Sequence, residues 1–207
     1  MLKILGRPTS INVRKVQWLC DEMALPYALE LWGIGHRAPQ DPAFLALNPH
    51  AMVPVLVDDG QALWESNALC RYLADRQQRA DLLPAPGLAR ARVEQWMDWQ
   101  ATELNNAWRY AFMHHVRRSP AHADPAAVLA SESAWNRQMA VLDAQLAATG
   151  AFVVGTTFTL ADIVIGLSVH RWLQTPIAHA ALPAVAAYHA RLCARPAFGP
   201  HGPRGAP

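Results

Sequence analysis

The sequence predicts a two-domain protein in which a small α/β domain is followed by an all-α helical domain. Up to residue 79, short apolar runs of strand length alternate with segments of helical periodicity. A segment rich in proline and glycine follows, and after it we find helical periodicity but no convincing strand. We therefore expect domains at residues 1–79 and 89–207, joined by a linker at residues 80–88.

Composition and charge exclude several classes of protein. Of the 207 residues, 52% are hydrophobic and only 16% are charged, which is too apolar for a disordered chain and sufficient for a buried core. The net charge is +2 without a dense run of lysine and arginine, so we expect no nucleic-acid partner. Since there is no membrane-length apolar run and no signal peptide, we expect a cytoplasmic protein without a membrane segment.

The cysteines and histidines show no metal-binding spacing. Cys20, Cys70 and Cys193 lie far apart without a CxxC pattern, and the first two fall on apolar helical stripes. We expect buried, reduced thiols in a reducing compartment. His114 and His115 are neighbours on a predicted helix, where adjacent side chains diverge, so we expect a solvated helix end and no metal site.

The first domain begins with a predicted strand, helix and strand. Residues 2–5 form a short apolar run, and residues 27–31 alternate as a strand. Between them, residues 12–25 have apolar positions at helical spacing, and Ser10 or Asn12 can cap the helix start. Together these elements form a βαβ unit, whose crossover should be right-handed.

A loop, a hairpin and a helix complete this domain. Residues 33–49 are loop-like, and "VPVLV" and "ALW" flank Asp58-Asp59-Gly60, which is a strong hairpin signal. Ser66 then caps a helix. The order βαβ, loop, ββα is the thioredoxin-like arrangement.

Four helices are predicted for the second domain. Residues 159–162, "TLAD", form a capping box that we assign to folding. The tail from Pro196 is rich in proline and glycine and is expected to be extended. The helical segments are residues 88–118, residues 125–148, "TFTLADIVIGLSVHRWL" and "LPAVAAYHARLCAR".

A proline stands where the third strand should begin. Pro54 has no N–H group to donate, and such prolines are kept to edges, bulges and first strand positions. In a thioredoxin-like order, Pro54 matches a cis-proline that turns the backbone of Val53 outward to pair with an extended peptide. We therefore predict a cis Val53–Pro54 bond, with an ordinary edge-strand proline as the alternative.

Glu65 and Ser66 lie where a strand ends and a helix begins. A helix N-terminus offers free N–H groups and binds a carboxylate, to which the Ser66 hydroxyl can add a donor. Glu65 is an acceptor and suits an ammonium group. The pair can hold the head group of a free α-amino acid. The alternative is that Ser66 only caps the helix.

Four segments together resemble the cytosolic glutathione transferases: "GRPTSINVRKV", "NPHAMVPVL", "LWESNALCRYLA" and "TLADI". The resemblance is to bacterial theta-like, serine-type members, and it implies the glutathione transferase fold. It also implies that Ser66 and the helix start bind the γ-glutamyl carboxylate of glutathione. Glu65 would then bind its amino group, and Val53, before Pro54, would pair with its cysteinyl backbone.

Ser10 is the candidate activator of the glutathione thiol. It follows the first strand and lies four residues before Arg14, as the family serine does. One hydroxyl bond and the start of the helix can supply the required stabilisation of a thiolate. Thr9 and Asn12 are close rivals, and loop capping is the alternative role of all three.

The remaining site residues are less well defined. Many relatives have a basic or amide residue at the position of Met52, so we expect one contact to the peptide to be missing here. The glycine carboxylate of glutathione needs a donor, for which His50 and His36-Arg37 are candidates, with a plain surface position as the alternative. The electrophile site between the domains is expected at Trp108, Arg109 and Phe112, although an aromatic stripe is more often core.

The leading function is therefore the conjugation of glutathione to small hydrophobic electrophiles, as in detoxification. Glutathione would be a co-substrate, with no permanently bound cofactor. The alternatives are a glutathione-dependent disulfide reductase or dehalogenase on the same fold, and a non-catalytic glutathione-binding or regulatory module. By the resemblance alone, we also expect a homodimer.

Overall fold

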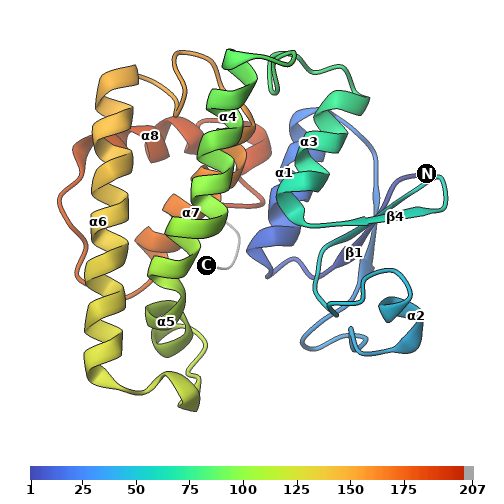
Figure 1. Ribbon diagram of the computed structural model, residues 1–207, viewed down its shortest axis with the longest axis horizontal. Helices are drawn as coiled ribbons and strands as arrows, with labels where there is room; N and C mark the ends of the chain where they lie inside the picture. Colours follow the sequence, from blue (N-terminus) through green and yellow to red (C-terminus); the bar gives the residue numbers. More distant parts are fainter. Residues whose placement is uncertain (203–207) are drawn as a thin grey trace.

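The first domain is built on a four-stranded mixed sheet (Figure 1). The computed structural model describes residues 1–202. The strands are β1 (Lys3–Gly6), β2 (Ala28–Leu31), β3 (Val55–Asp58) and β4 (Gln61–Trp64), in the spatial order β2-β1-β3-β4. β1 pairs with β2 in parallel, and the β1–β3 and β3–β4 pairs are antiparallel. The predicted thioredoxin-like order is confirmed.

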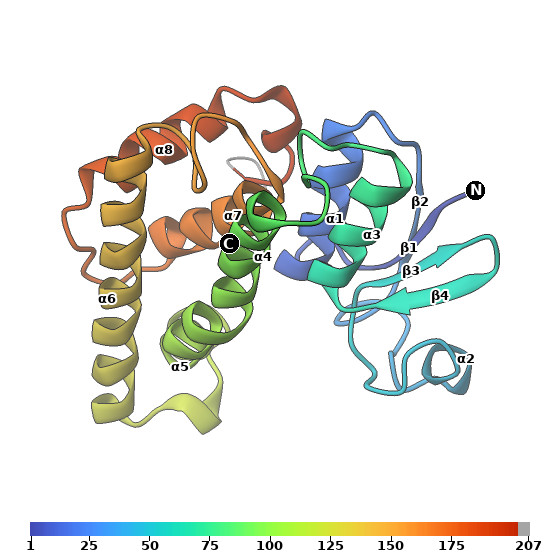
Figure 2. The same ribbon diagram turned by 45° about the horizontal axis from the view of Figure 1, so that its top comes forward.

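Helices cover both faces of this sheet. α1 (Ile11–Glu22) and α3 (Ser66–Arg76) lie toward the second domain, whereas the short α2 (Pro42–Leu45) lies on the other side (Figure 2). Successive side chains of a strand point to opposite faces. Leu5 therefore packs in a small cluster under α2, and Ile4 packs in the main core with α1 and α3.

The second domain is built from helices, as predicted. α7 runs through its middle, and residues 160–172 of this helix are all buried because α1, α4, α6 and α8 surround it. The helices are α4 (Leu88–Trp99), α5 (Asn105–His115), α6 (Pro125–Thr149), α7 (Leu160–Gln174) and α8 (Pro183–Cys193).

The chain is helical from Leu88 to His115, as predicted, but not as a single α-helix. Gln100–Leu104 forms a π-helical turn between α4 and α5. Gln100 is 1% exposed, and its side chain bonds to Lys15 of α1 and Ser168 of α7. Apolar periodicity carries no signal for a polar side chain that bonds two other helices, so the sequence did not reveal this turn.

The prediction of an extended tail from Pro196 is wrong as far as residue 202. Pro196–Phe198 forms a 3₁₀ turn, and Phe198 is fully buried with its ring centre 4.5 Å from that of Trp18. Composition cannot show that a remote tryptophan offers this ring a partner. Residues 203–207 lie outside the described residues.

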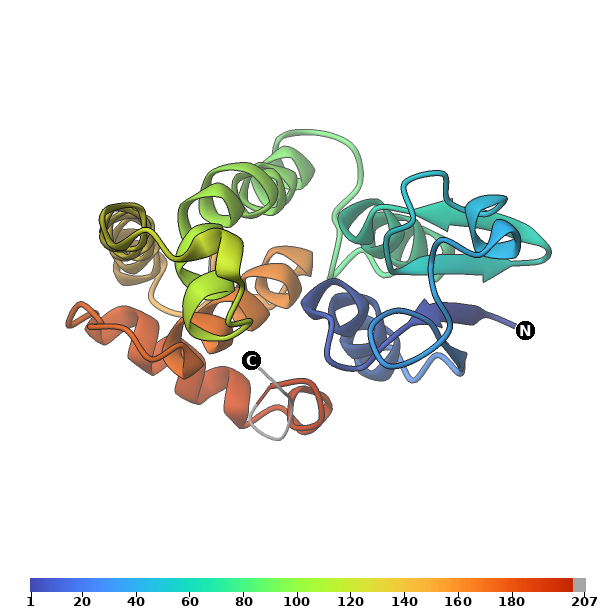
Figure 3. The ribbon, with the colours of Figure 1, turned by 90° about the horizontal axis from the view of Figure 1, so that it is seen from below.

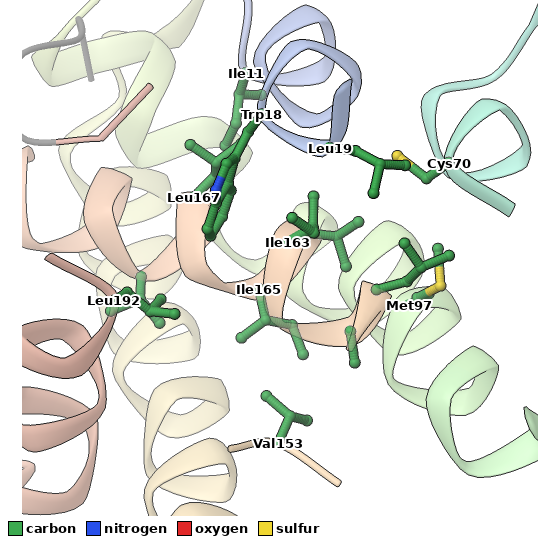
Figure 4. Close-up of a cluster of buried hydrophobic side chains, with 14 of the residues drawn as sticks. Ile11, Trp18, Leu19, Cys70, Met97, Val153, Ile163, Ile165, Leu167 and Leu192 are labelled. Atoms are coloured by element: carbon green, nitrogen blue, oxygen red, sulfur yellow. The ribbon is translucent and has the colours of Figure 1, made fainter. Parts of the chain in front are cut away.

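The two domains share one hydrophobic core. Figure 3 shows them side by side, with α1 in blue and α7 in orange at the boundary. In Figure 4, Ile11 and Trp18 of α1 face Leu167 of α7. A Cβ atom on Gly166 would lie 2.5 Å from a methyl group of Leu192 and 3.2 Å from the Trp18 ring. Glycine at this position therefore allows the close approach of α7 to both neighbours.

The two adjacent histidines do not form a solvated helix end. His115 Nε2 lies 2.6 Å from Glu132 Oε1, and His114 Nδ1 lies 2.8 Å from the carbonyl oxygen of His122. Neither histidine belongs to a metal-type cluster, since no three side chains of His, Cys, Asp or Glu gather in this way within residues 1–202.

Cys20 and Cys70 are buried free thiols, as predicted. None of the helices in the described part of the chain has both the length and the apolar character that crossing a lipid bilayer requires.

Candidate active site

Two adjoining cavities lie where loops of the first domain meet the starts of α1 and α3. Their volumes are about 470 Å³ and about 90 Å³. Asn12, Met52 and Val53 line both, so the cavities form one continuous site. Other lining residues include Arg7, Ser10, His36 and Gln40 in the larger cavity and Asn48, His50, Pro54, Glu65 and Ser66 in the smaller one.

The Val53–Pro54 peptide bond is cis, as predicted. β3 begins only at Val55, so the missing N–H group of Pro54 interrupts no ladder. Within the described residues, the backbone N–H and C=O groups of Val53 have no hydrogen-bond partner. Both groups are therefore available to an extended peptide in the cavity.

Asn48 fixes the loop that leads to Val53, and the sequence did not single it out. Its side chain is almost fully buried, and its Nδ2 donates a hydrogen bond to the carbonyl oxygen of Met52 at 2.8 Å. Its Oδ1 accepts one from the N–H group of His50 at 3.0 Å. Asn48-Pro49 is a turn signal in the sequence, but only the structure shows the reach to Met52.

The start of α3 lines the smaller cavity. Glu65 is the N-cap residue, with a φ of 72° that residues other than glycine seldom adopt. The prediction that Ser66 caps this helix is wrong, because Ser66 is the first helical residue and no side-chain capping bond is formed. The Ser66 hydroxyl thus makes no hydrogen bond within the described residues and borders the cavity. The first-turn N–H groups beside it suit an anion.

α1 begins at the larger cavity. Ser10 is its N-cap residue but makes no side-chain capping bond, so its hydroxyl is unoccupied. Asn12, in the first turn, lines both cavities. Thr9 is exposed and does not line either cavity. The structure therefore brings Ser10 and Asn12 together and leaves Thr9 outside.

The candidate donors to a glycine carboxylate lie at different places. His36 is exposed and lines the larger cavity, whereas His50 lines the smaller one and packs edge-on against Trp64. Arg37 is already engaged: it pairs with Glu30 at 2.9 Å and stacks on the ring of Trp32. Of the neighbouring pair, His36 is thus the better placed donor.

Trp108, Arg109 and Phe112 do not line the two cavities. Phe112 is 3% exposed and Trp108 is half-buried, and their rings meet edge to face at 5.3 Å. Arg109, on the same helix, is exposed. Arg171 of α7 stacks on both rings, 4.2 Å from the centre of Phe112 and 4.7 Å from that of Trp108. The aromatic stripe is therefore mostly packed, with an arginine against it.

A buried lysine lies behind the start of α3. Lys15 is 1% exposed, and its Nζ donates to Oδ1 of Asn67 at 3.2 Å and to Oε1 of Gln100 at 2.8 Å. Burial lowers the pKa of Lys15 to about 8, so the amine is still largely protonated at pH 7. Since Asn67 directly follows Ser66, this positive charge lies close to the end of the cavity that suits an anion.

Comparisons with known proteins place both halves of the chain in one family. Residues 5–81 match the model of the glutathione S-transferase N-terminal domain, and residues 100–196 match that of the C-terminal domain. The chain is 37% identical to glutathione S-transferase GstB of Escherichia coli K12, over 95% of each chain.

A solved structure and a second relative are also similar to almost the whole chain. The glutathione-bound theta class glutathione S-transferase from Xanthomonas axonopodis pv. citri superposes with a TM-score of 0.88 at 36% identity, covering 99% of this chain and 96% of that one. A disulfide-bond oxidoreductase of E. coli K12, YfcG, is 28% identical over 96% of this chain and 93% of its own length.

Proposed function

The chain belongs to the glutathione S-transferase family, as a bacterial theta-like member, and from the geometry of its site we propose that it joins the thiol of glutathione to small electrophiles. The observation that carries the proposal is the unoccupied hydroxyl of Ser10 at the start of α1. This hydroxyl borders the same continuous site as the unpaired backbone of Val53 and the unoccupied hydroxyl of Ser66.

In the proposed arrangement, the γ-glutamyl end of glutathione would lie in the smaller cavity. The Ser66 hydroxyl and the first N–H groups of α3 would bind its α-carboxylate, and Glu65 would bind its amino group. The cysteinyl backbone would pair with Val53, beside the cis-proline. The glycine carboxylate would then reach the larger cavity near His36.

In this arrangement the sulfur lies near Ser10, where a thiolate can be stabilised. Lowering the pKa of a thiol from about 8.5 by about two units requires about 2.7 kcal/mol. A hydrogen bond to a charged group contributes about 1.5–3 kcal/mol, and a helix N-terminus about 0.3–1 kcal/mol. The Ser10 hydroxyl and α1 together are therefore sufficient, without a general base.

The test is the pH–rate profile of Ser10→Ala with a generic aryl halide. We expect the bound thiol to titrate at higher pH and kcat at neutral pH to fall, while glutathione still binds, because Ser10 touches only the sulfur. Thr9→Ala is the matched control and should behave as the wild type. Unchanged kcat and thiol pKa in Ser10→Ala would exclude Ser10 as the activator.

A second candidate function is glutathione-dependent disulfide reduction. Asn12 favours it, because its side chain lines both cavities beside Ser10 and could contact the sulfur instead. A wild type that reduces a mixed disulfide of glutathione but conjugates no electrophile, and an Asn12→Ala variant that loses the reduction, would support this alternative. Binding of glutathione without either activity would indicate a non-catalytic module.

We further propose that the protein is a homodimer, in which the first domain of one subunit contacts the helical domain of the other. Exposed apolar side chains on both domains support this arrangement, including Leu63 and Trp64 of β4 and Leu129 and Val141 of α6. Light scattering should give twice the monomer mass at micromolar concentration. Free thiols at Cys20, Cys70 and Cys193 support a reducing compartment.

A further inference from the structure

An arginine of α7 is buried without a hydrogen bond or a counter-ion. Arg171 is 3% exposed, and within the described residues its guanidinium donates no hydrogen bond and joins no ion pair. Its Nε is completely enclosed, whereas its terminal nitrogens are not. Stacking on Phe112 and Trp108 covers the face of the guanidinium, but it leaves all five N–H donors without acceptors.

Two more arginines, Arg14 and Arg117, lie near Arg171, and Arg7 lies near Arg117. Arg117, beyond the end of α5, lies over the same Phe112 ring at 5.4 Å. Arg14 of α1 is 2% exposed and bonds only to the carbonyl oxygen of His201, while Arg7 lines the larger cavity. None of the four pairs with a carboxylate within residues 1–202. Burial first, then nearby arginines, lower the pKa of Arg171 to about 9 and of Arg14 to about 10.

The helix geometry places Arg171 near the start of α1, although of the four arginines only Arg7 lines one of the two cavities. Ile11 and Trp18 of α1 face Leu167 of α7 (Figure 4), and Ile163 lies near Leu19. Side chains four residues apart lie on the same face of a helix, so Arg171 follows Leu167 on the face of α7 that packs against α1. Arg171 thus lies one helical turn beyond Leu167, on the side away from Ile163. This is the side of the start of α1, where Ser10 and Arg7 line the larger cavity.

Four cations that have no acidic partner within residues 1–202 are costly to hold near one another. The usual compensation is an anion, and a guanidinium binds a carboxylate with two parallel hydrogen bonds. The aromatic rings stack on the face of the Arg171 guanidinium, and its terminal nitrogens, which are not completely enclosed, are the groups that could bind such a ligand.

We propose that the electrophile carries a carboxylate, which Arg171 binds with Arg117 and Arg7 beside the thiolate at Ser10. This inference rests on the proposed function and names its substrate class. In the reaction, the glutathione thiolate attacks the carbon that bears a halide, a C–S bond forms, and the C–halogen bond breaks. The halide leaves with the bonding electron pair, and the carboxylate is unchanged. The arginines offset the repulsion between thiolate and carboxylate.

The first test compares two ligands that differ in one charge, S-(carboxymethyl)glutathione and S-(carbamoylmethyl)glutathione. Calorimetry should show the carboxymethyl compound binding at least about tenfold more tightly to the wild type, as expected for charged hydrogen bonds. Equal affinities would overturn the inference and leave the proposed function intact. If neither compound binds, the proposed function fails and the inference fails with it.

The second test uses turnover of 4-chloro-3-nitrobenzoate and the corresponding benzamide, each divided by its uncatalysed rate. We expect a preference for the benzoate in the wild type, and the loss of most of it in Arg171→Met. Arg137→Met, which removes an exposed arginine from α6, is the matched control and should keep the preference.

Stability and neutral ligands separate this role from a structural one. Arg171→Met removes an uncompensated buried charge, so its unfolding temperature should equal or exceed that of the wild type. It should also leave the affinity for S-(carbamoylmethyl)glutathione unchanged. A variant that weakens both glutathione derivatives equally would show that Arg171 binds glutathione itself, and would overturn the inference. If Arg171→Met does not fold, the affinities for the two glutathione derivatives are measured with Arg117→Met, which changes an exposed arginine.

Discussion

Nζ of Lys15 in α1 lies 2.8 Å from Oε1 of Gln100, the first residue of the π-helical turn, and donates a hydrogen bond across the domain boundary. The same ammonium group bonds to Asn67 beside the start of α3, and Gln100 also bonds to Ser168 of α7. A single buried cation thus connects the first domain to the π-helical turn of the second domain and, through Gln100, to α7.

The stability of the protein should depend on the titration of Lys15. Its pKa in the folded state is about 8, below the value of about 10.4 in an unfolded chain. Between these values the unfolded chain binds more protons. The Lys15 contribution to the free energy of unfolding therefore rises with pH across this window, by up to about 3 kcal/mol.

Urea unfolding of Lys15→Met at pH 7 to 10 tests this dependence. The variant should lack the part of the slope that Lys15 provides. Lys3→Met, at the exposed position of the chain's other lysine, should retain it. Identical pH profiles for wild type and Lys15→Met would contradict the prediction.

Replacing Ser66 should affect binding and leave folding unchanged. The hydroxyl would hold a part of glutathione that does not react, so Ser66→Ala should raise KM for glutathione about tenfold with little change in kcat. Because Ser66 makes no capping bond, the free energy of unfolding should change by less than about 0.5 kcal/mol. Steady-state kinetics and urea unfolding measure the two effects. A loss of kcat without a rise in KM would be the wrong outcome for a binding residue.

Asn48 should act as a positioning residue for Val53. Asn48→Ala removes two hydrogen bonds of the loop, to Met52 and His50, and should cost about 1–3 kcal/mol of stability. The backbone of Val53 would lose its fixed orientation, so KM for glutathione should rise while the pH dependence of kcat stays as in the wild type. Asn48→Asp keeps only the acceptor, so its stability and its KM for glutathione should lie between those of the wild type and of Asn48→Ala. A shifted thiol pKa would argue for a direct role at the sulfur instead.

Asp162 should be among the most sensitive positions for stability. Its buried carboxylate accepts hydrogen bonds from Thr159, Val153 and Tyr188. Asp162→Asn turns one acceptor into a donor that faces these donors, so we expect a loss of about 2–4 kcal/mol.

Burial raises the pKa of Asp162 to about 6. The Asp162 contribution to stability is therefore fully present below about pH 4 and declines as pH rises toward 6. Chemical unfolding of wild type and Asp162→Asn at pH 4 and pH 7 tests both the loss of stability and its pH dependence. If the two proteins differ in free energy of unfolding by the same amount at both pH values, the predicted pH dependence is wrong.

Gly166→Ala should destabilise the boundary between the domains, although alanine favours a helix by about 1 kcal/mol. The added Cβ would lie 2.5 Å from a methyl group of Leu192, and overpacking of this kind costs about 1–3 kcal/mol. We expect a net loss of about 1 kcal/mol or more. A double-mutant cycle with Leu192→Ala should show favourable coupling, because the smaller side chain leaves room for the Cβ. Additive effects would contradict the steric explanation.

The order of elements could be predicted because local signals specify it. Alternation at residues 27–31, the Asp58-Asp59-Gly60 turn and helical spacing after residue 88 each follow from residues near in sequence. The cis-proline and the Glu65–Ser66 helix start could be found for the same reason. These features lie at boundaries between strand and helix, where proline, serine and acidic residues have specific backbone roles.

Contacts between distant segments could not be predicted. The pairing of Lys15 with Gln100, the docking of Phe198 on Trp18 and the reach of Asn48 to Met52 each depend on where the folded backbone places both partners. Ser66 was expected to cap its helix, and only the actual backbone angles at Glu65 show that its hydroxyl is unoccupied.

The sequence by itself therefore determined the two-domain plan, the family and several of the residues that line the cavities. Periodicity and turn chemistry encode the two-domain plan. A short, ordered set of motifs indicates the family and the residues that line the cavities. Only the tertiary structure decided which charged side chains gather where the two domains meet. Arg7, Arg14, Arg117 and Arg171 come from four separate segments, and nothing in the sequence shows that they gather in one region with no acidic partner within residues 1–202. The charge of a site is a sum over neighbours in space, and neighbours in space are fixed only when the helices pack.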